Sequence, residues 1–155
     1  MLSTSAIDCI SPVRLGFVAS VSPGGRPSVS PNGTFLVLDE RTIAFGEVWS
    51  LGSINNIGHS PKVEVNFVDP FTRKGWRIRS LTSVLHRETH GFDGIFSKWT
   101  VLWGDLFHRI KAIVVVRISQ VKALSTPPYD DGVSEAEMVA VYKAKYAEMF
   151  LNALR

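Results

Sequence analysis

The sequence has little of what several classes of protein require. It contains a single cysteine, Cys9, among 155 residues, which excludes an internal disulfide and any metal site built from several cysteines. No apolar run approaches the roughly 20 residues that a membrane helix needs, and the run 110–118 is cut by Lys111 and Arg117. The first ten residues lack the basic region and long apolar run of a signal peptide. These absences favour a cytoplasmic protein that does not bind a membrane.

Charge is also modest. Charged residues make up 20% of the chain and hydrophobic residues 45%, as in an ordinary globular protein, and the formal net charge is +3. Acidic residues are interleaved with the basic ones, so no long positive stripe appears and we expect no nucleic-acid partner. One local cluster stands out, because four basic residues fall within seven positions at Arg73, Lys74, Arg77 and Arg79. Such a cluster suits one or two phosphate groups better than a duplex.

The order of apolar and polar segments predicts a mainly β protein. We expect strands over 15–21, 27–29 resuming at 35–38, 43–46, 63–68, 76–85 and 110–121, with Pro31 and Gly33 interrupting the second. We expect short helices over 50–60 and 91–103, and a last helix that begins at the capping box of 134–137. The pattern of about six strands fits a small antiparallel barrel in one domain, with its core over about 15–122 and a C-terminal loop and helix over 124–155.

Residues suited to holding a phosphate and a planar ring gather at the ends of these strands. A helix start offers free amide donors and a partial positive charge, so it binds phosphate without a lysine. The candidate ligand-binding residues are Ser28, Val29, Ser30, Pro31, Asn32, Trp49, Ser50, Gly52, Ser53, Asn56, Arg73, Lys74, Gly75, Trp76 and Arg77. The serines and Asn56 could equally be ordinary helix-capping residues. The basic residues could form a solvent-exposed turn, and the two tryptophans could pack in the core or in a dimer interface.

In order and spacing, these motifs resemble the pyridoxamine 5′-phosphate oxidase-like family, whose fold is the FMN-binding split barrel. The resemblance rests on residues 25–34, 50–56, 61–67, 73–77, 109–116 and 127–132. It implies a mainly β fold, a six- to seven-stranded antiparallel split β-barrel with a C-terminal helix, and a homodimer with two FMN sites at the interface. It also implies that Ser28 to Asn32 line the flavin, that the Ser50 to Asn56 helix start takes the phosphate, and that the second subunit contributes near Arg73 to Arg77.

The chain also departs from the family pattern. Many members carry basic residues where this chain has Asn32 and where it has Ile54 and Asn55, so we expect a weaker grip on the phosphate. Members that form pyridoxal phosphate have arginine and histidine in a C-terminal segment, and this tail has neither before Arg155. The resemblance therefore implies an oxidoreductase that acts on an unknown small molecule, and oxidation of pyridoxamine phosphate is not expected.

Other functions remain open from the sequence. The family also contains deazaflavin-dependent reductases and carriers of flavin or haem that catalyse no reaction. No Ser-His-Asp arrangement is evident, as expected where a cofactor performs the redox chemistry, and catalytic residues stay unassigned. His86 and His90 are four residues apart, but no third ligand is in sight and we expect no metal. Apolar residues of the helix with Trp99 and Trp103, and of the stripe from Met138 to Phe150, are expected to drive dimerisation.

Overall fold

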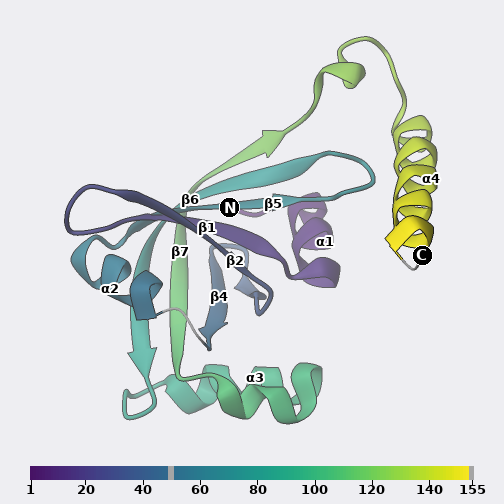
Figure 1. The fold of residues 1–155 in the computed structure, drawn as a ribbon. Coiled ribbons are helices and arrows are strands. Elements are labelled where there is room, and N and C mark those ends of the chain that lie inside the picture. Colours follow the sequence, from purple (N-terminus) through teal and green to yellow (C-terminus); the bar gives the residue numbers. More distant parts are fainter. Residues whose placement is uncertain (49–50, 154–155) are drawn as a thin grey trace.

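Seven antiparallel strands form one open sheet in the computed structural model, which describes residues 1–48 and 51–153. The strands are β1 (Gly16–Val21), β2 (Pro27–Asn32), β3 (Leu36–Asp39), β4 (Thr42–Glu47), β5 (Lys62–Val68), β6 (Gly75–His86) and β7 (Ala112–Leu124). Their order across the sheet is β2-β1-β5-β6-β7-β4-β3. The long strands β6 and β7 pair along almost their whole length and join the two halves (Figure 1). The mainly β split-barrel class expected from the sequence is confirmed.

The helices lie around this sheet. They are α1 (Thr4–Val13), α2 (Leu51–His59), α3 (Phe92–Trp103) and α4 (Glu135–Ala153), with the 3₁₀ helices η1 (Gly104–Arg109) and η2 (Pro127–Tyr129). Helix α4 stands to one side of the body, beyond the β5–β6 hairpin, and α3 lies across one end of the sheet (Figure 1). No helix in the described part of the chain is both long and apolar enough to cross a membrane.

Strand β2 corrects one expectation. The sequence predicts a break at Pro31, but the strand continues through it to Asn32, in antiparallel register with β1 from Gly16 to Val21. Proline removes a backbone donor and is therefore confined mostly to sheet edges, where one side of the strand has no neighbour. Strand β2 is such an edge strand. The break spans Gly33 to Phe35, before β3 begins at Leu36.

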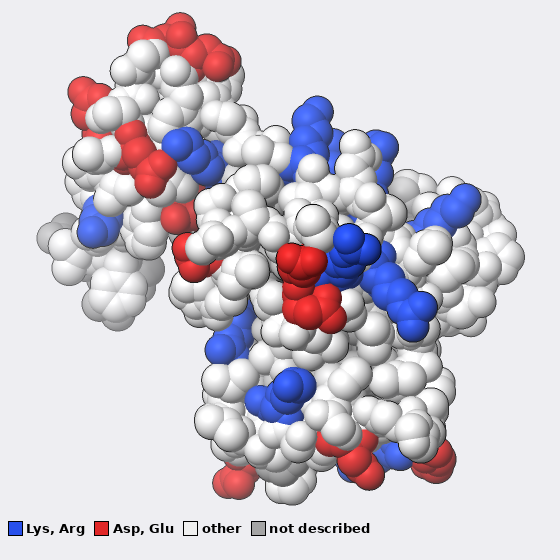
Figure 2. All heavy atoms as spheres, turned by 180° about the vertical axis from the view of Figure 1, so that it is seen from behind, with Lys and Arg blue, Asp and Glu red and all other residues white. Residues whose placement is uncertain are grey.

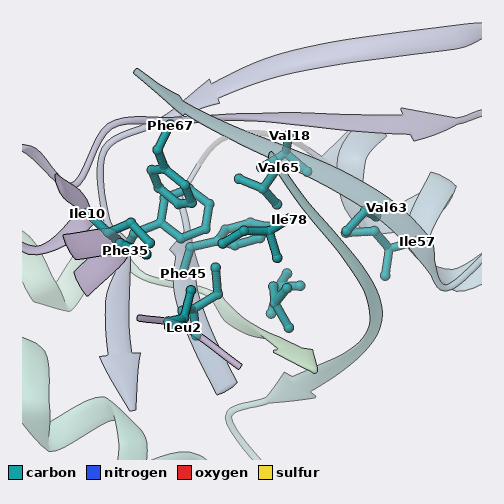
Figure 3. Packing of buried hydrophobic residues seen from close by; sticks show 14 residues of the cluster. Leu2, Ile10, Val18, Phe35, Phe45, Ile57, Val63, Val65, Phe67 and Ile78 are labelled. Atoms are coloured by element: carbon teal, nitrogen blue, oxygen red, sulfur yellow. The ribbon is translucent and has the colours of Figure 1, made fainter. Parts of the chain in front are cut away.

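The main core lies on the concave side of the sheet. Phe35 packs against Phe45 and Phe67, with ring centroids 5.0 and 4.8 Å apart, and all three side chains are at most 2% exposed. Helix α1 closes this core through Ile10, which is fully buried (Figure 3). Helix α1 was not expected from the sequence. It begins at Thr4, and the hydroxyl of the preceding Ser3 caps it by accepting a hydrogen bond from the Ala6 amide.

A second core lies on the opposite face of β3, β4 and β7. Alternate residues of these strands point there, including Ala44 and Ile113, and α3 covers them with Phe92 and Trp99. The indole nitrogen of Trp99 donates to the Thr34 carbonyl at 2.8 Å. The three- and four-residue spacing of aromatic residues correctly predicts this helix. Trp99 is wholly buried in its own chain, so it is not part of an exposed dimerisation surface.

Helix α4 buries only part of its apolar stripe. It begins at the predicted capping box, where the Ser134 amide and hydroxyl contact the Glu137 carboxylate at 2.8 and 2.7 Å. Met138 is buried, whereas Val141, Met149 and Phe150 are 60, 56 and 65% exposed. The helix contacts the body through Tyr142 and Tyr146, which lie against Arg73 and Phe71, and its last turns present apolar side chains to solvent.

Candidate functional site

The inner face of edge strand β2 meets the first turns of α2 at one corner of the sheet. Side chains alternate along β2, so Ser28, Ser30 and Asn32 are half-buried on the α2 side and Val29 lies exposed on the other. The Ser30 and Ser53 hydroxyl oxygens lie 3.3 Å apart. The structure therefore brings together one residue from the predicted flavin strand and one from the predicted phosphate helix.

Two predicted phosphate residues also fasten α2 to the sheet. The Asn56 side-chain amide donates to the Ser20 hydroxyl at 3.1 Å, and both side chains are buried. Ser53 is only 7% exposed. The sequence analysis places Ser53 at a helix start or cap, and the structure shows that it is also packed against β2. Gly52 is exposed in the first turn of the helix, while Trp49 and Ser50 lie outside the described residues.

The polar corner contains neutral donors. Within the described residues, the hydroxyls of Ser30 and Ser53 contact each other and no lysine or arginine. Asn32 is engaged in the turn to β3, since its side-chain oxygen accepts from the Thr34 amide at 3.2 Å. An anion at this corner would therefore be bound by hydroxyl and amide donors and by the dipole of α2.

The basic turn between β5 and β6 is engaged elsewhere. The Lys74 ammonium is 2.8 Å from the Glu135 carboxylate and lies over the Tyr129 ring at 4.4 Å. Its hydrogen bond to Glu135 raises the pKa of Lys74. The Arg73 guanidinium lies over the Tyr142 ring at 4.9 Å. Within one chain, these two cations hold α4 against the body and do not reach the Ser30 corner.

Gly75 and Trp76 have packing roles. A β-carbon at Gly75 would collide with the backbone carbonyl of Phe67, so only glycine allows β5 and β6 to pair this closely here. Trp76 is half-buried against the main core and also lines a cavity of about 480 Å³ with Cys9 and Asp8. Neither residue lies at the Ser30 corner in the same chain.

Arg77 lies on the opposite, outer face of the sheet. Pro31, Phe17, Asn66 and Arg77 follow one another in register across β2, β1, β5 and β6. With strands about 4.8 Å apart, the backbones of Pro31 and Arg77 are separated by roughly 14 Å. A ligand at the Ser30 corner can contact Arg77 only if a second copy of the chain supplies it.

The outer face holds features that the sequence analysis missed. A trough of about 610 Å³ runs over β1, β2, β5 and β6. Its lining includes the apolar Val21, Val29 and Leu81, the charged Glu64 and Arg79, and Ser28 of the predicted flavin strand. The alternation of each strand was visible in the sequence, but the register that brings these residues together was not. In the described part of the chain no group of three or more potential ligands could hold a metal ion.

The cavity beside α1 contains the only cysteine of the sequence. Burial raises the pKa of the Cys9 thiol, and the nearby Asp69 carboxylate raises it further. A thiol with a raised pKa is mostly protonated at neutral pH and a weak nucleophile. Cys9 is therefore not a candidate for nucleophilic catalysis.

Several solved structures share this fold, and the names of some of them give a ligand. HupZ from Group A Streptococcus superposes with a TM-score of 0.70 at 21% identity, over 81% of this chain and 96% of that one. An FMN-binding protein from Syntrophomonas wolfei superposes with a TM-score of 0.64 at 15% sequence identity, over 78% of this chain and 84% of that one. The haem storage protein HutZ from Vibrio cholerae superposes with a TM-score of 0.65 at 15% sequence identity, over 80% of this chain and 94% of that one. An F420 reductase is a further structural neighbour at 18% identity.

These likenesses show the fold alone, because all four sequence identities are below 25%. No curated protein matches the sequence at a significant level. The family model of pyridoxamine 5′-phosphate oxidase, by contrast, matches residues 5–152, which is nearly the whole chain. The likeness first read from the short motifs is thereby confirmed, and the chain belongs to the pyridoxamine 5′-phosphate oxidase family.

Proposed function

We propose that this protein binds FMN and serves as a flavin-dependent oxidoreductase for a small molecule. The observation that carries the proposal is the corner where the polar side of edge strand β2 meets the start of α2, with the Ser30 and Ser53 hydroxyls 3.3 Å apart. A helix N-terminus and two hydroxyls together supply donors for one phosphate group. An edge strand also has backbone groups with no strand beside them, which suit the polar edge of a flavin ring.

The residues at the corner fit FMN through neutral donors. The Ser30 and Ser53 hydroxyls would donate hydrogen bonds to the phosphate in place of their contact with each other. The backbone amides of the first turn of α2 would donate the remaining hydrogen bonds. The segment Ser28 to Asn32 would lie along the ring system. FMN, when bound, supplies the redox chemistry, and the chain supplies position and exclusion of water.

We further propose a homodimer. The last turns of α4 expose Met149, Phe150 and Leu151, which are consecutive large apolar side chains and not scattered surface residues. The first half of the same helix packs on the basic turn, where the Arg73 guanidinium lies over Tyr142. A contact between copies along α4 therefore places the basic turn at the interface. From there a second chain can contribute near Arg73 to Arg77.

The dimer is tested by sedimentation at micromolar concentration. The parent protein should sediment at twice 17.1 kDa, and Phe150→Glu should shift it towards the monomer, because a charge buried in an apolar contact is costly. Val141→Glu, nine residues away and therefore on the opposite side of α4, replaces an equally exposed apolar side chain; it is the matched control and should leave the mass unchanged. A parent that is monomeric while binding flavin tightly contradicts the two-chain site.

The ligand itself is tested by the absorbance spectrum of the purified protein, with mass spectrometry of the released molecule. Oxidised-flavin bands and the mass of FMN are the expected result. A haem spectrum would favour the carrier function that the name of HutZ suggests, and a deazaflavin would favour the F420 reductase. We expect the protein to act in the cytoplasm.

A further inference from the structure

The C-terminal segment from η2 to the end of α4, residues 127–153, lies against a single turn of the body, and we call this segment the strap. The turn covers residues 69–74 and joins β5 to β6 (Figure 1). In η2 the Tyr129 hydroxyl donates to the Thr72 carbonyl at 2.6 Å. On α4 the Tyr146 ring meets an aromatic ring of the same turn edge-on, with centroids 5.8 Å apart.

The strap occupies both cations of this turn. The Lys74 ammonium lies 2.8 Å from the Glu135 carboxylate and 4.4 Å from the centre of the Tyr129 ring. The Arg73 guanidinium lies 4.9 Å from the centre of the Tyr142 ring. While the strap is docked, both positive charges are therefore satisfied within their own chain.

The strap and the turn carry opposite charge. From residue 127 to 137 the strap has no basic side chain. Its acidic residues over that range are Asp130, Asp131, Glu135 and Glu137. Figure 2 shows acidic side chains gathered over η2 and the start of α4. Attraction between exposed charges draws the strap to the turn, and dissolved salt screens it.

The contacts that dock the strap are weak ones. In the described part of α4 only Met138 is buried, and neither core includes a described side chain of η2 or α4. Lys74 and Glu135 are 45 and 57% exposed, and exposed ion pairs and cation–π contacts contribute little stability. At the hinge before η2, the Thr126 hydroxyl is buried without a hydrogen-bond partner among the described residues, which disfavours the docked position. The strap can therefore leave the turn without opening a core.

The same contacts form part of the wall of the cavity beside α1. Lys74 and Glu135 line this cavity of about 480 Å³ together with Cys9. Cys9 is the single cysteine of the sequence, and its side chain is half-buried. Departure of Glu135 removes part of the wall and admits reagents to the thiol. Cys9 is therefore a built-in reporter of the position of the strap.

We propose that the strap is an autoinhibitory latch. Docked, it keeps Arg73 and Lys74 within their own chain; undocked, it frees both cations for a phosphate bound at the Ser30 corner of a second copy. The inhibition rests on the proposed FMN site, whereas the movement of the strap does not. The dimer contact that we propose at the last turns of α4 lies beyond these contacts, and the strap stays joined to β7 in both positions.

Labelling of Cys9 by iodoacetamide, followed by mass spectrometry at one pH, measures the movement without any flavin. Glu135→Gln and Tyr142→Ala should each raise the labelling rate about two- to fivefold, because each removes one exposed contact that docks the strap. Added salt should raise the rate of the parent more than that of Glu135→Gln, which has already lost the ion pair. Labelling of glutathione under the same conditions corrects for any effect of salt on the reagent.

Two further variants of α4 are the matched controls. Glu148→Gln removes the same charge as Glu135→Gln, two residues beyond Tyr146 and so on the other side of the helix from the turn. Val141→Ala shortens an exposed side chain beside Tyr142. Both should label at the rate of the parent. Circular dichroism should show the same helix content in all variants, since the substituted side chains lie at the surface.

The inhibition has a separate test. Glu135→Gln and Tyr142→Ala should bind FMN about two- to fivefold more tightly than the parent, because a larger fraction of the chains then presents free cations. Riboflavin has no phosphate, and its affinity should not change. A parent that binds no flavin would remove the FMN site and with it the inhibition, while the labelling still reports whether the strap moves.

Two results would overturn the latch itself. Equal labelling of the parent, Glu135→Gln and Tyr142→Ala at low and high salt would show that the strap does not leave the turn. Faster labelling of both variants with the FMN affinity of the parent would show that the strap moves but inhibits nothing.

Discussion

Ser53→Ala separates the two roles that the structure gives this side chain. Its hydroxyl lies 3.3 Å from the Ser30 hydroxyl and is 7% exposed, so it packs α2 on β2 and also lies where a phosphate would bind. A neutral hydrogen bond of this kind contributes about 1 kcal/mol to stability. For a chain of this size that corresponds to a fall in melting temperature of about 2–4 °C. The variant should therefore remain folded.

The effect on ligand affinity should be larger and selective. A hydrogen bond to a charged group contributes about 1.5–3 kcal/mol, so FMN should bind roughly ten- to a hundredfold more weakly to Ser53→Ala. Riboflavin has the same ring system without phosphate, and its affinity should not change. Equilibrium titration of both flavins, followed by flavin fluorescence, measures the two constants under one condition.

Ser80→Ala is the matched control. Ser80 is also buried, at 5% exposure, and its hydroxyl donates to the Val63 carbonyl at 3.2 Å, away from the corner. It should lose comparable stability and keep the FMN affinity of the parent. Equal losses for FMN and riboflavin in Ser53→Ala would show that Ser53 acts only through packing. Unchanged FMN affinity would show that the corner holds no phosphate.

Three further predictions concern other parts of the molecule. Arg77→Ala should weaken FMN binding by the dimer, with a loss that shrinks as salt is added, because the side chain is 39% exposed; a loss that ignores salt contradicts an ionic contact. Phe35→Ala should lower the free energy of unfolding by about 3–5 kcal/mol, measured by urea denaturation, since it removes a buried ring that contacts two others. Cys9 should react slowly with iodoacetamide at neutral pH and faster as pH rises past the ordinary thiol value, because burial raises its pKa; rapid reaction at pH 7 would contradict this.

Much of the fold follows from local patterns in the sequence. The alternation of Val63, Val65 and Phe67 predicts β5, the spacing of Phe92 and Trp99 predicts α3, and Ser134 with Glu137 predicts the start of α4. These signals are local, because each element is specified by its own periodicity or cap. The break at Pro31 was wrong, since whether a proline interrupts a strand depends on its position in the sheet, which the sequence does not reveal.

The candidate site was less predictable. Ser30 and Ser53 are 23 residues apart in the chain, and the resemblance to a family brought them into one hypothesis. Nothing local indicated that Arg73 and Lys74 hold α4, because their partners Tyr142 and Glu135 lie far along the chain. The outer trough depends on the register of β1, β2, β5 and β6. Contacts of this kind arise from tertiary packing, and single-sequence patterns do not encode them.

The central claim, that the corner of β2 and α2 is an FMN site, is tested most directly by titrating the parent protein with FMN, riboflavin and FAD. The corner offers donors for one phosphate group, and we propose no site for an adenine ring. FMN should therefore bind at least about tenfold more tightly than riboflavin, as one charge-assisted contact implies, and more tightly than FAD. Equal affinity for riboflavin and FMN, or no binding of any flavin, would contradict the account.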